Sequence, residues 1–261
     1  MELRQFAERI LCAESLEEKL APFVGTPTDH ARGDSWRPPL PGRPLNLIIA
    51  PRRMAPAMPT AAALADPRKR GLAHHIMANH ELQAVEVMAF VLCAFPEAPS
   101  EFRLGLARIL GDEQRHTRMH AERAGELGVP FGSRPVNGHF WKQTAKFESL
   151  LDYLATLPLV FEQGNLDHTL QFERLFLLHG DRKGAGILRA IHRDEIEHVR
   201  FGWEWFERLR RGDGSACAEW AARLPWPLRA EKARGPRFHR EPRAAAGLPP
   251  ELIDLVERAS G

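Results

Sequence analysis

The sequence predicts an all-α protein whose centre is a four-helix bundle made of two helical hairpins. The first observation behind this is a motif, Asp-Glu-x-x-His, that occurs twice in helical sequence, at 112–116 and at 194–198. The second is a glutamate in an apolar run upstream of each copy: Glu81 and Glu162 lie 32 and 33 residues before the motif glutamates. Both features recur after 81 or 82 residues, which indicates a diverged internal repeat.

Each half of this repeat has the pattern of a helical hairpin. The midpoint between Glu81 and Glu113 is Glu97, inside a Phe-Pro-Glu-Ala-Pro segment, and the second midpoint lies beside Gly180. Pro and Gly at these points are turn signals. Residues equidistant from a turn stand level on the two arms, here about 16 residues or roughly 24 Å from the bend. We therefore expect each upstream glutamate to face the motif on the opposite arm.

The segments before the bundle come first along the chain. We expect one or two helices over 2–22, followed by an extended strap from Gly25 to Pro59 that is rich in Pro, Gly and Arg. The apolar stretch from Leu45 to Ile49 should sit in a groove. Residues 1–67 therefore form an N-terminal helical arm and strap.

The bundle itself is expected over 68–212, with helices at 68–95, 100–127, 159–178 and 182–211. The second and third helices need a long crossover, in which we expect a shorter helix from Phe140 to Leu157, closed by Pro158. Gly164 lies inside the third helix, where it indicates a close contact or a π-bulge, or is simply tolerated.

A basic, Pro-rich extension follows at 213–261. It should contain a short helix over 215–224, a Pro-punctuated tail over 224–242, and a last amphipathic helix from Pro249 to Ser260.

Composition limits the broad class. A chain of 261 residues with 44% hydrophobic content can bury a full core. The net charge of +2 does not indicate a nucleic acid or a membrane as a partner. Three widely spaced cysteines suggest no disulfide framework, the N-terminus is unlike a signal peptide, and the apolar run from Val87 to Phe95 is too short to cross a bilayer. We therefore expect a soluble, cytoplasmic protein with no membrane partner.

The motif residues have the chemistry of metal ligands. A spacing of three places the Glu and His of each motif on one helix face, one turn apart. With the upstream glutamates they offer four carboxylates and two imidazoles, the ligand set of carboxylate-bridged di-iron or di-manganese bundles. The alternative is solvated charge, but Glu81 and Glu162 lie among apolar residues, where an unpaired carboxylate is costly. The predicted metal ligands are Glu81, Glu113, His116, Glu162, Glu195 and His198.

Other residues near these ligands are weaker candidates. His80, His120, His168 and His192 flank the ligands and are better explained as helix-face or supporting residues than as a seventh ligand. Glu86 lies about 140° around the helix from Glu81 and is the reserve ligand if Glu81 fails.

With these residues in place, the chain resembles the ferritin-like superfamily. The sequence Asn-His-Glu-Leu-Gln-Ala at 79–84, followed by Asp-Glu-Gln-Arg-His at 112–116, is similar to sequences of the superfamily's bacterial branch that is related to the MiaE-type tRNA hydroxylases. The resemblance covers roughly residues 70–211. It implies a ferritin-like bundle that binds two iron ions, with manganese or a mixed pair as alternatives. It also implies that Glu113 and Glu195 bridge the metals, and we expect these two to be the catalytic carboxylates.

The resemblance also implies supporting residues. The aspartate before each motif glutamate matches a position that, in di-iron oxygenases and ribonucleotide reductase small subunits, binds the ligand histidine of the opposite hairpin. We therefore expect Asp112 to contact His198 and Asp194 to contact His116. Such contacts fix the histidine tautomer and raise its basicity as a ligand.

Three functions compete. The favoured one is a di-iron oxygenase or hydroxylase that uses O2 and an external electron donor to oxidise an organic substrate. An iron-handling ferroxidase is the second; ferritin storage subunits are compact, whereas this chain spends about 120 residues on straps, crossover and tails. A radical-generating subunit fits worst, because the single tyrosine, Tyr153, is not on the turn adjacent to a ligand.

The substrate is less constrained. Seven basic residues and two aromatic rings lie between Arg223 and Arg243, and basic residues interleaved with stacking rings can bind RNA. A solvated basic tail has the same composition, so tRNA is the second substrate candidate. The sequence leaves the oligomeric state open.

Overall fold

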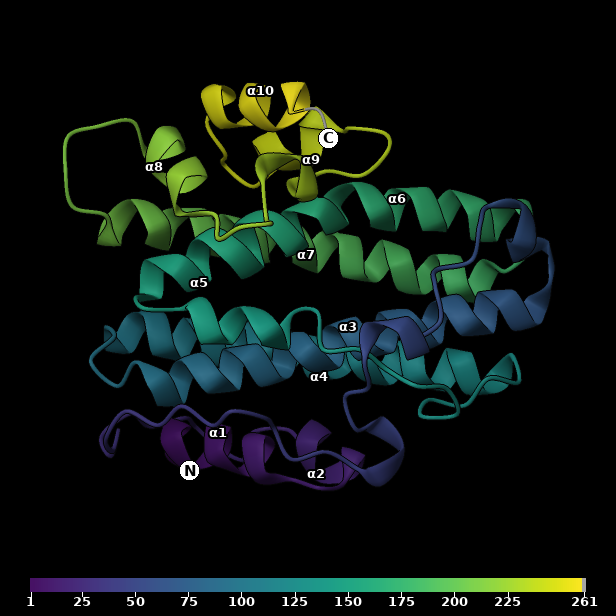
Figure 1. Ribbon diagram of the computed structural model, residues 1–261, viewed down its shortest axis with the longest axis horizontal. Coiled ribbons are helices and arrows are strands. Elements are labelled where there is room, and N and C mark those ends of the chain that lie inside the picture. The colour runs from purple at the N-terminus through teal and green to yellow at the C-terminus, as the bar shows by residue number, and fades with distance from the viewer. Residues whose placement is uncertain (260–261) are drawn as a thin grey trace. The chain divides into compact units, whose positions relative to one another are not determined.

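The computed structural model describes residues 1–259, and it is all-helical: no strand occurs in that range, only isolated bridges at Glu2–Thr28 and Ile49–Val136 (Figure 1). The predicted all-α class is confirmed. The chain divides into two compact units, Met1–Ala145 and Lys146–Gly261. Ser260 and Gly261, at the ends of the predicted last helix and C-terminal extension, lie outside the described residues.

The core of the first unit is the hairpin of α3 (Pro67–Ala94) and α4 (Ser100–Glu126), which pack along each other (Figure 1). The Asp66 side chain caps α3 by accepting a hydrogen bond from the Arg68 N–H, and Pro67 occupies the first helical position, where no N–H is needed. The five residues between the helices contain Pro96 and Pro99, so the turn falls where the sequence predicts it.

By length and composition, α3 is the one helix in 1–259 that could cross a membrane. Its mean hydropathy reaches 1.2 over an 18-residue window, of which 89% is buried inside the protein. A buried core helix has the same composition, so this is weak evidence for a span.

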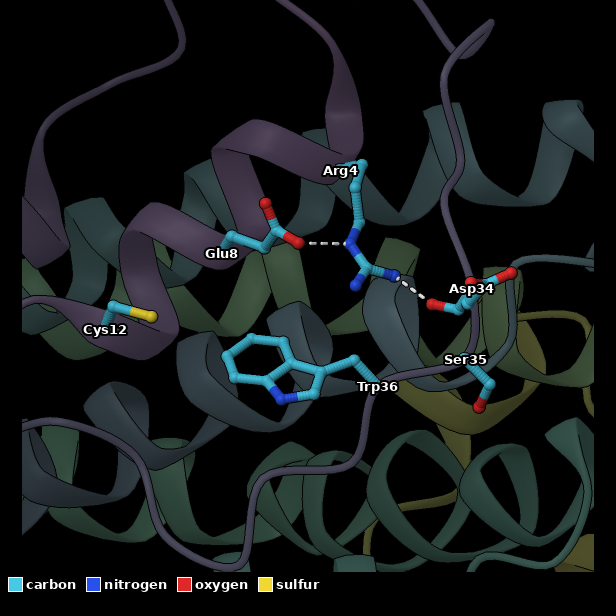
Figure 2. Close-up of a pocket in the computed structure, with 6 residues that line it drawn as sticks. All are labelled: Arg4, Glu8, Cys12, Asp34, Ser35 and Trp36. Atoms are coloured by element: carbon cyan, nitrogen blue, oxygen red, sulfur yellow. Dashed lines mark hydrogen bonds and ion pairs between the residues drawn. The ribbon is translucent and has the colours of Figure 1, made fainter.

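The N-terminal arm packs against this hairpin as two helices, α1 (Leu3–Cys12) and α2 (Leu16–Leu20), and the Ser15 side chain caps the second. Arg4 of α1 holds the strap that follows. Its guanidinium bonds to the Glu8 carboxylate and to the Asp34 carbonyl, both at 2.6 Å, beside the indole of Trp36 (Figure 2).

The strap is irregular, with short 3-10 turns at Leu45–Leu47, Arg52–Met54 and Ala62–Ala65. The prediction that Leu45 to Ile49 sits in a groove is wrong for most of that stretch. Only Leu47 is buried, in a cluster with Leu82 and Val136, whereas Leu45 is 90% exposed. A 3-10 turn brings one side chain in three to the same side, so a single residue enters the core.

The crossover is fastened to α3 by two buried amides. The Gln83 carbonyl accepts hydrogen bonds from the Phe140 and Trp141 N–H groups, and the Asn79 amide donates to the Asn137 carbonyl. The predicted helix from Phe140 to Leu157 is wrong. A 3-10 segment, η4 (Trp141–Lys146), is followed by α5 (Leu150–Thr156), which a Ser149–Asp152 capping box begins.

Pro158 does not end a helix, contrary to prediction. The second unit runs from α5 through a π-helical stretch, η5 (Leu157–Glu162), into α6 (Gln163–Leu178). Pro158 is the second residue of the π stretch, a position whose N–H would have no partner within that stretch. The ring needs space on α7 (Arg182–Leu209): a Cβ on Gly202 would lie 2.4 Å from the Pro158 Cβ.

The second hairpin, α6 with α7, turns at 179–181, where Gly180 has a φ of 74° and Asp181 caps α7. The extension adds α8 (Ala216–Arg223), η6 (Ala230–Ala233), α9 (Arg240–Ala245) and α10 (Pro250–Arg258). A Cβ on Gly164 would lie 3.2 Å from the Lys232 carbonyl, so this glycine admits η6 close to α6. Both structural roles considered for Gly164, a close contact and a neighbouring π turn, are present.

Candidate metal centre

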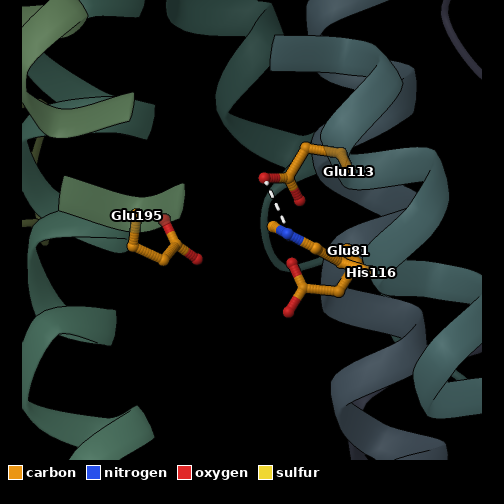
Figure 3. Close-up of side chains that lie close together, drawn as sticks. All are labelled: Glu81, Glu113, His116 and Glu195. Atoms are coloured by element: carbon orange, nitrogen blue, oxygen red, sulfur yellow. Dashed lines mark ion pairs between the residues drawn. The ribbon is translucent and has the colours of Figure 1, made fainter. Parts of the chain in front are cut away.

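The first unit brings three predicted ligands together. Glu81 comes from α3, and Glu113 and His116 come from one face of α4; all three are buried. Each offers a ligand atom within 4.8 Å of the others. Figure 3 shows these side chains pointing toward one another, with the Glu113 Oε1 at 3.5 Å from the His116 Nδ1. In this unit the upstream glutamate therefore faces the motif on the opposite arm of the hairpin, as the sequence predicts.

Two further histidines extend this cluster. The His120 Nε2 lies 3.8 Å from the Glu81 Oε1, and the His120 Nδ1 lies 2.8 Å from the His74 Nδ1. Burial, followed by the neighbouring imidazoles of His74, His116 and His80, holds the pKa of His120 well below its usual range. His120 is therefore a neutral imidazole at neutral pH, and one of the two facing Nδ1 atoms donates while the other accepts.

The residues next to Glu113 point elsewhere and fix the rotation of α4. The Gln114 amide donates to the Lys19 and Ala21 carbonyls at the end of α2. Asp112 bonds to Arg115 at 2.6 Å on the partly exposed side of the helix. With these residues held, Glu113 and His116 face the hairpin interior.

The second unit buries the corresponding three residues of the repeat. Glu162 ends η5, and Glu195 and His198 lie one turn apart on α7; all are buried. Ligand atoms of Glu162 and His198 come within 4.8 Å, and the His198 Nδ1 lies 3.7 Å from the Glu195 Oε2. Glu195 is the fourth side chain drawn in Figure 3.

Asn165, which the sequence analysis did not single out, belongs to this second set. Its amide donates to the Glu195 Oε1 at 2.8 Å, which fixes that carboxylate. The backbone carbonyl of Asn165 accepts a hydrogen bond from the Thr169 hydroxyl, which also lies 2.9 Å from the His192 Nδ1. The signal was available: Asn165 is three residues after Glu162, hence on the neighbouring part of the same helix surface.

The donor chemistry of the first set, Glu81, Glu113 and His116, fits a metal ion. Carboxylate oxygens and imidazole nitrogens bind divalent cations at about 2 Å, so donors around one ion lie up to about 4 Å apart, close to the separations described. Two buried carboxylates that approach this closely repel each other, and a cation between them relieves the repulsion. This buried group could therefore hold a metal ion.

Glu86 is not the reserve ligand considered from the sequence. Its carboxylate accepts hydrogen bonds from the Nε and Nη2 groups of Arg43 and lies 3.0 Å from the Lys19 Nζ. All three side chains are buried. Arg43 also donates to the Asn79 carbonyl oxygen at 3.1 Å. Two protein cations therefore neutralise Glu86, and this position ties the arm and strap to α3.

Asp112 and Asp194 both lie on their motif helices at partly exposed positions. Their contacts with His198 and His116 stay predictions, as do the metal-binding roles of the six ligands and the catalytic roles of Glu113 and Glu195.

The protein is thus a helical one whose two hairpins each bury a Glu and a Glu-x-x-His motif, side chains that could hold a metal ion. By sequence it belongs to the DUF455 family, described as "Protein of unknown function (DUF455)", which matches residues 4–254. It is also 27% identical over 148 residues to an uncharacterised protein of Haemophilus influenzae. That alignment covers 54% of this chain and 51% of the relative, so the chain spans about half the relative's length. No solved structure matches.

Proposed function

We propose that the two sets of ligands form one dinuclear centre in a ferritin-like four-helix bundle, and that the protein is a non-haem di-iron oxygenase. The observation that carries this is the repetition: each unit buries a motif Glu and His, with a second glutamate from the other arm of its hairpin. Four carboxylates and two imidazoles are what a carboxylate-bridged di-iron or di-manganese site requires.

The chain's own residues would supply the ligands and the dry surroundings. Glu81, Glu113 and His116 would hold one side of the metal pair, and Glu162, Glu195 and His198 the other. Bound iron would supply the ability to activate O2 for oxidation of an organic substrate, with electrons from an external donor. Burial keeps bulk water away from the ligands.

The histidines and amides around the ligands would orient them. Neutral His120, fixed by His74, can present its Nε2–H to Glu81, and Asn165 holds Glu195. Such supporting contacts set the direction and basicity of metal ligands.

Anaerobic titration with Fe(II), followed by exposure to O2, tests the proposal. We expect two iron ions per chain and a single oxidation event per site, with no mineral core. Repeated turnover of Fe(II) into a core would favour an iron-handling protein instead, and a chain that binds no metal would contradict both.

A MiaE-like tRNA hydroxylase is the second candidate, because of the basic segment 223–243. Several of its arginines are engaged within the protein: Arg223 pairs with Asp152, Arg240 with Asp254, and buried Arg243 with Asp167. Arg229 instead stacks on Trp226, which is 72% exposed and offers an aromatic face to a base. Comparison of modified nucleosides in tRNA from a deletion strain and its parent tests this candidate.

A further inference from the structure

A pocket of about 340 Å³ lies in the second unit, between α6 and the segment that leads into α9. This volume is within the range of small-molecule sites. Two arginines, a histidine and a glutamine give it a polar, basic lining, with Leu170 and Pro236 as its apolar part. The lining residues are Leu170, Gln171, Arg174, Pro236, Arg237 and His239.

The wall formed by 235–239 is held by a buried carboxylate. Asp167 of α6 accepts hydrogen bonds from the backbone N–H groups of Gly235 at 2.9 Å and His239 at 2.8 Å. The same carboxylate pairs with Arg243, and both side chains are fully buried. A Cβ on Gly235 would lie 2.8 Å from the Asp167 Cβ, so only glycine allows this approach. The wall is therefore pre-organised, which lowers the entropic cost of ligand binding.

The two arginines of the pocket are available to a ligand. Arg174 and Arg237 are exposed, and within residues 1–259 neither makes an ion pair. Arg4, in the pocket of Figure 2, differs because Glu8 and backbone carbonyls take up its guanidinium. A basic pocket with uncommitted guanidinium groups attracts an anion.

The chemistry of the lining selects the anion. Each guanidinium can bind two oxygens of a phosphate in a fork, and two of them match the charge of about −1.5 to −2 on a phosphomonoester better than the single charge of a carboxylate. Asp167 lies 3.1 Å from the His239 Nδ1, which leaves Nε2 as the ring nitrogen for a further phosphate oxygen. Leu170 and Pro236 offer an apolar surface to the rest of the ligand.

We propose that this pocket binds the phosphate group of a small phosphorylated molecule of nucleoside-monophosphate size. The site involves none of the predicted metal ligands, so it does not depend on the oxidation chemistry proposed above.

Calorimetric titration of the full-length protein with AMP, adenosine and inorganic phosphate tests this at low ionic strength. We expect one AMP per chain, competition by inorganic phosphate, and no binding of adenosine. Arg174→Ala and Arg237→Ala should each raise the Kd for AMP about tenfold or more, because each removes a charge-assisted pair of hydrogen bonds.

Arg211→Ala is the matched control, since Arg211 is an exposed arginine of the same unit outside the pocket; its Kd for AMP should equal that of the wild type. Thermal unfolding of all three variants should match the wild type. The proposal is overturned if AMP does not bind saturably or if both pocket variants bind it normally. It is equally overturned if single-stranded RNA binds through these arginines while AMP does not, since the surface would then be a nucleic-acid contact.

Discussion

Two buried carboxylates on α3, five residues apart, are stabilised in different ways. Glu86 is surrounded by Lys19 and Arg43, whose charges come from the N-terminal arm and strap. The contacts described for Glu81 are with imidazole and carboxylate groups: His120 at 3.8 Å, and Glu113 and His116 within 4.8 Å. The comparison teaches that one helix can bury one glutamate among protein cations and another among groups that could hold a metal ion, according to what the rest of the chain places opposite.

The largest expected effect is at Glu86. Glu86→Gln keeps the volume but leaves Lys19 and Arg43 buried without a counter-charge, so we expect the free energy of unfolding to fall by about 3–5 kcal/mol. Urea unfolding measures this. Glu122→Gln, at an exposed position on α4, should change stability by less than about 0.5 kcal/mol.

Measuring the metal content of the same variant separates the role of Glu86 from that of Glu81. Folded Glu86→Gln protein should bind as much metal as the wild type, because Glu86 already has its cations. Reduced metal per folded chain would mean that the two positions are one functional network.

The next effect concerns pH. Burial, assisted by the charge of Arg134, lowers the pKa of His75 on α3 from 6.5 to about 4. Between these values the unfolded chain holds a proton that the folded chain does not. Stability is therefore full above pH 6.5 and falls as the pH drops toward 4, by about 3 kcal/mol.

Urea unfolding at several pH values checks this, with His75→Phe as the comparison variant. Phenylalanine removes the titrating group, so its stability should vary less over this window. An equal slope in the two proteins would show that other groups cause the acid sensitivity.

A smaller effect is expected from Glu113→Gln. At a metal concentration 100 times the Kd, one site stabilises the wild type by about 2.7 kcal/mol, and this increment should disappear in the variant. Stability without metal should stay equal or rise, because the variant removes a like charge near Glu81. Thermal unfolding with and without Fe(II) or Mn(II) separates the two contributions, and a drop in apo stability matching that of Glu86→Gln would contradict the comparison.

The smallest effect belongs to Asn165. Asn165→Ala should raise the Kd for metal about tenfold, since a supporting hydrogen bond to a ligand is lost, while stoichiometry stays unchanged. Equilibrium metal titration measures it. An unchanged Kd would show that Glu195 needs no such support.

The long helices of the two hairpins and the cluster of Glu81, Glu113 and His116 were the predictable part. A spacing of three within a helix and equal distances from a turn are geometric, so the positions of Glu113, His116 and Glu81 relative to one another followed from numbering alone. Glycine and proline marked both hairpin turns for the same reason.

Contacts made by irregular segments could not be read in the same way. Nothing in the local sequence of Arg43 indicates that its strap delivers the guanidinium to Glu86, because the two are 43 residues apart and no periodicity links them. The prediction at Pro158 was wrong for a related reason. A proline by itself predicts the end of a helix, but the space above Gly202 lets the chain continue as a π turn.

Metal stoichiometry in matched variants of the two halves tests the central claim most directly. Iron or manganese per chain would be measured after anaerobic loading of the wild type, Glu113→Gln and Glu195→Gln. We predict two ions in the wild type and a loss of metal in both variants, because the proposed function assigns Glu113 and Glu195 to one dinuclear centre. A wild type that binds no metal, or variants that each keep both ions, would contradict the account.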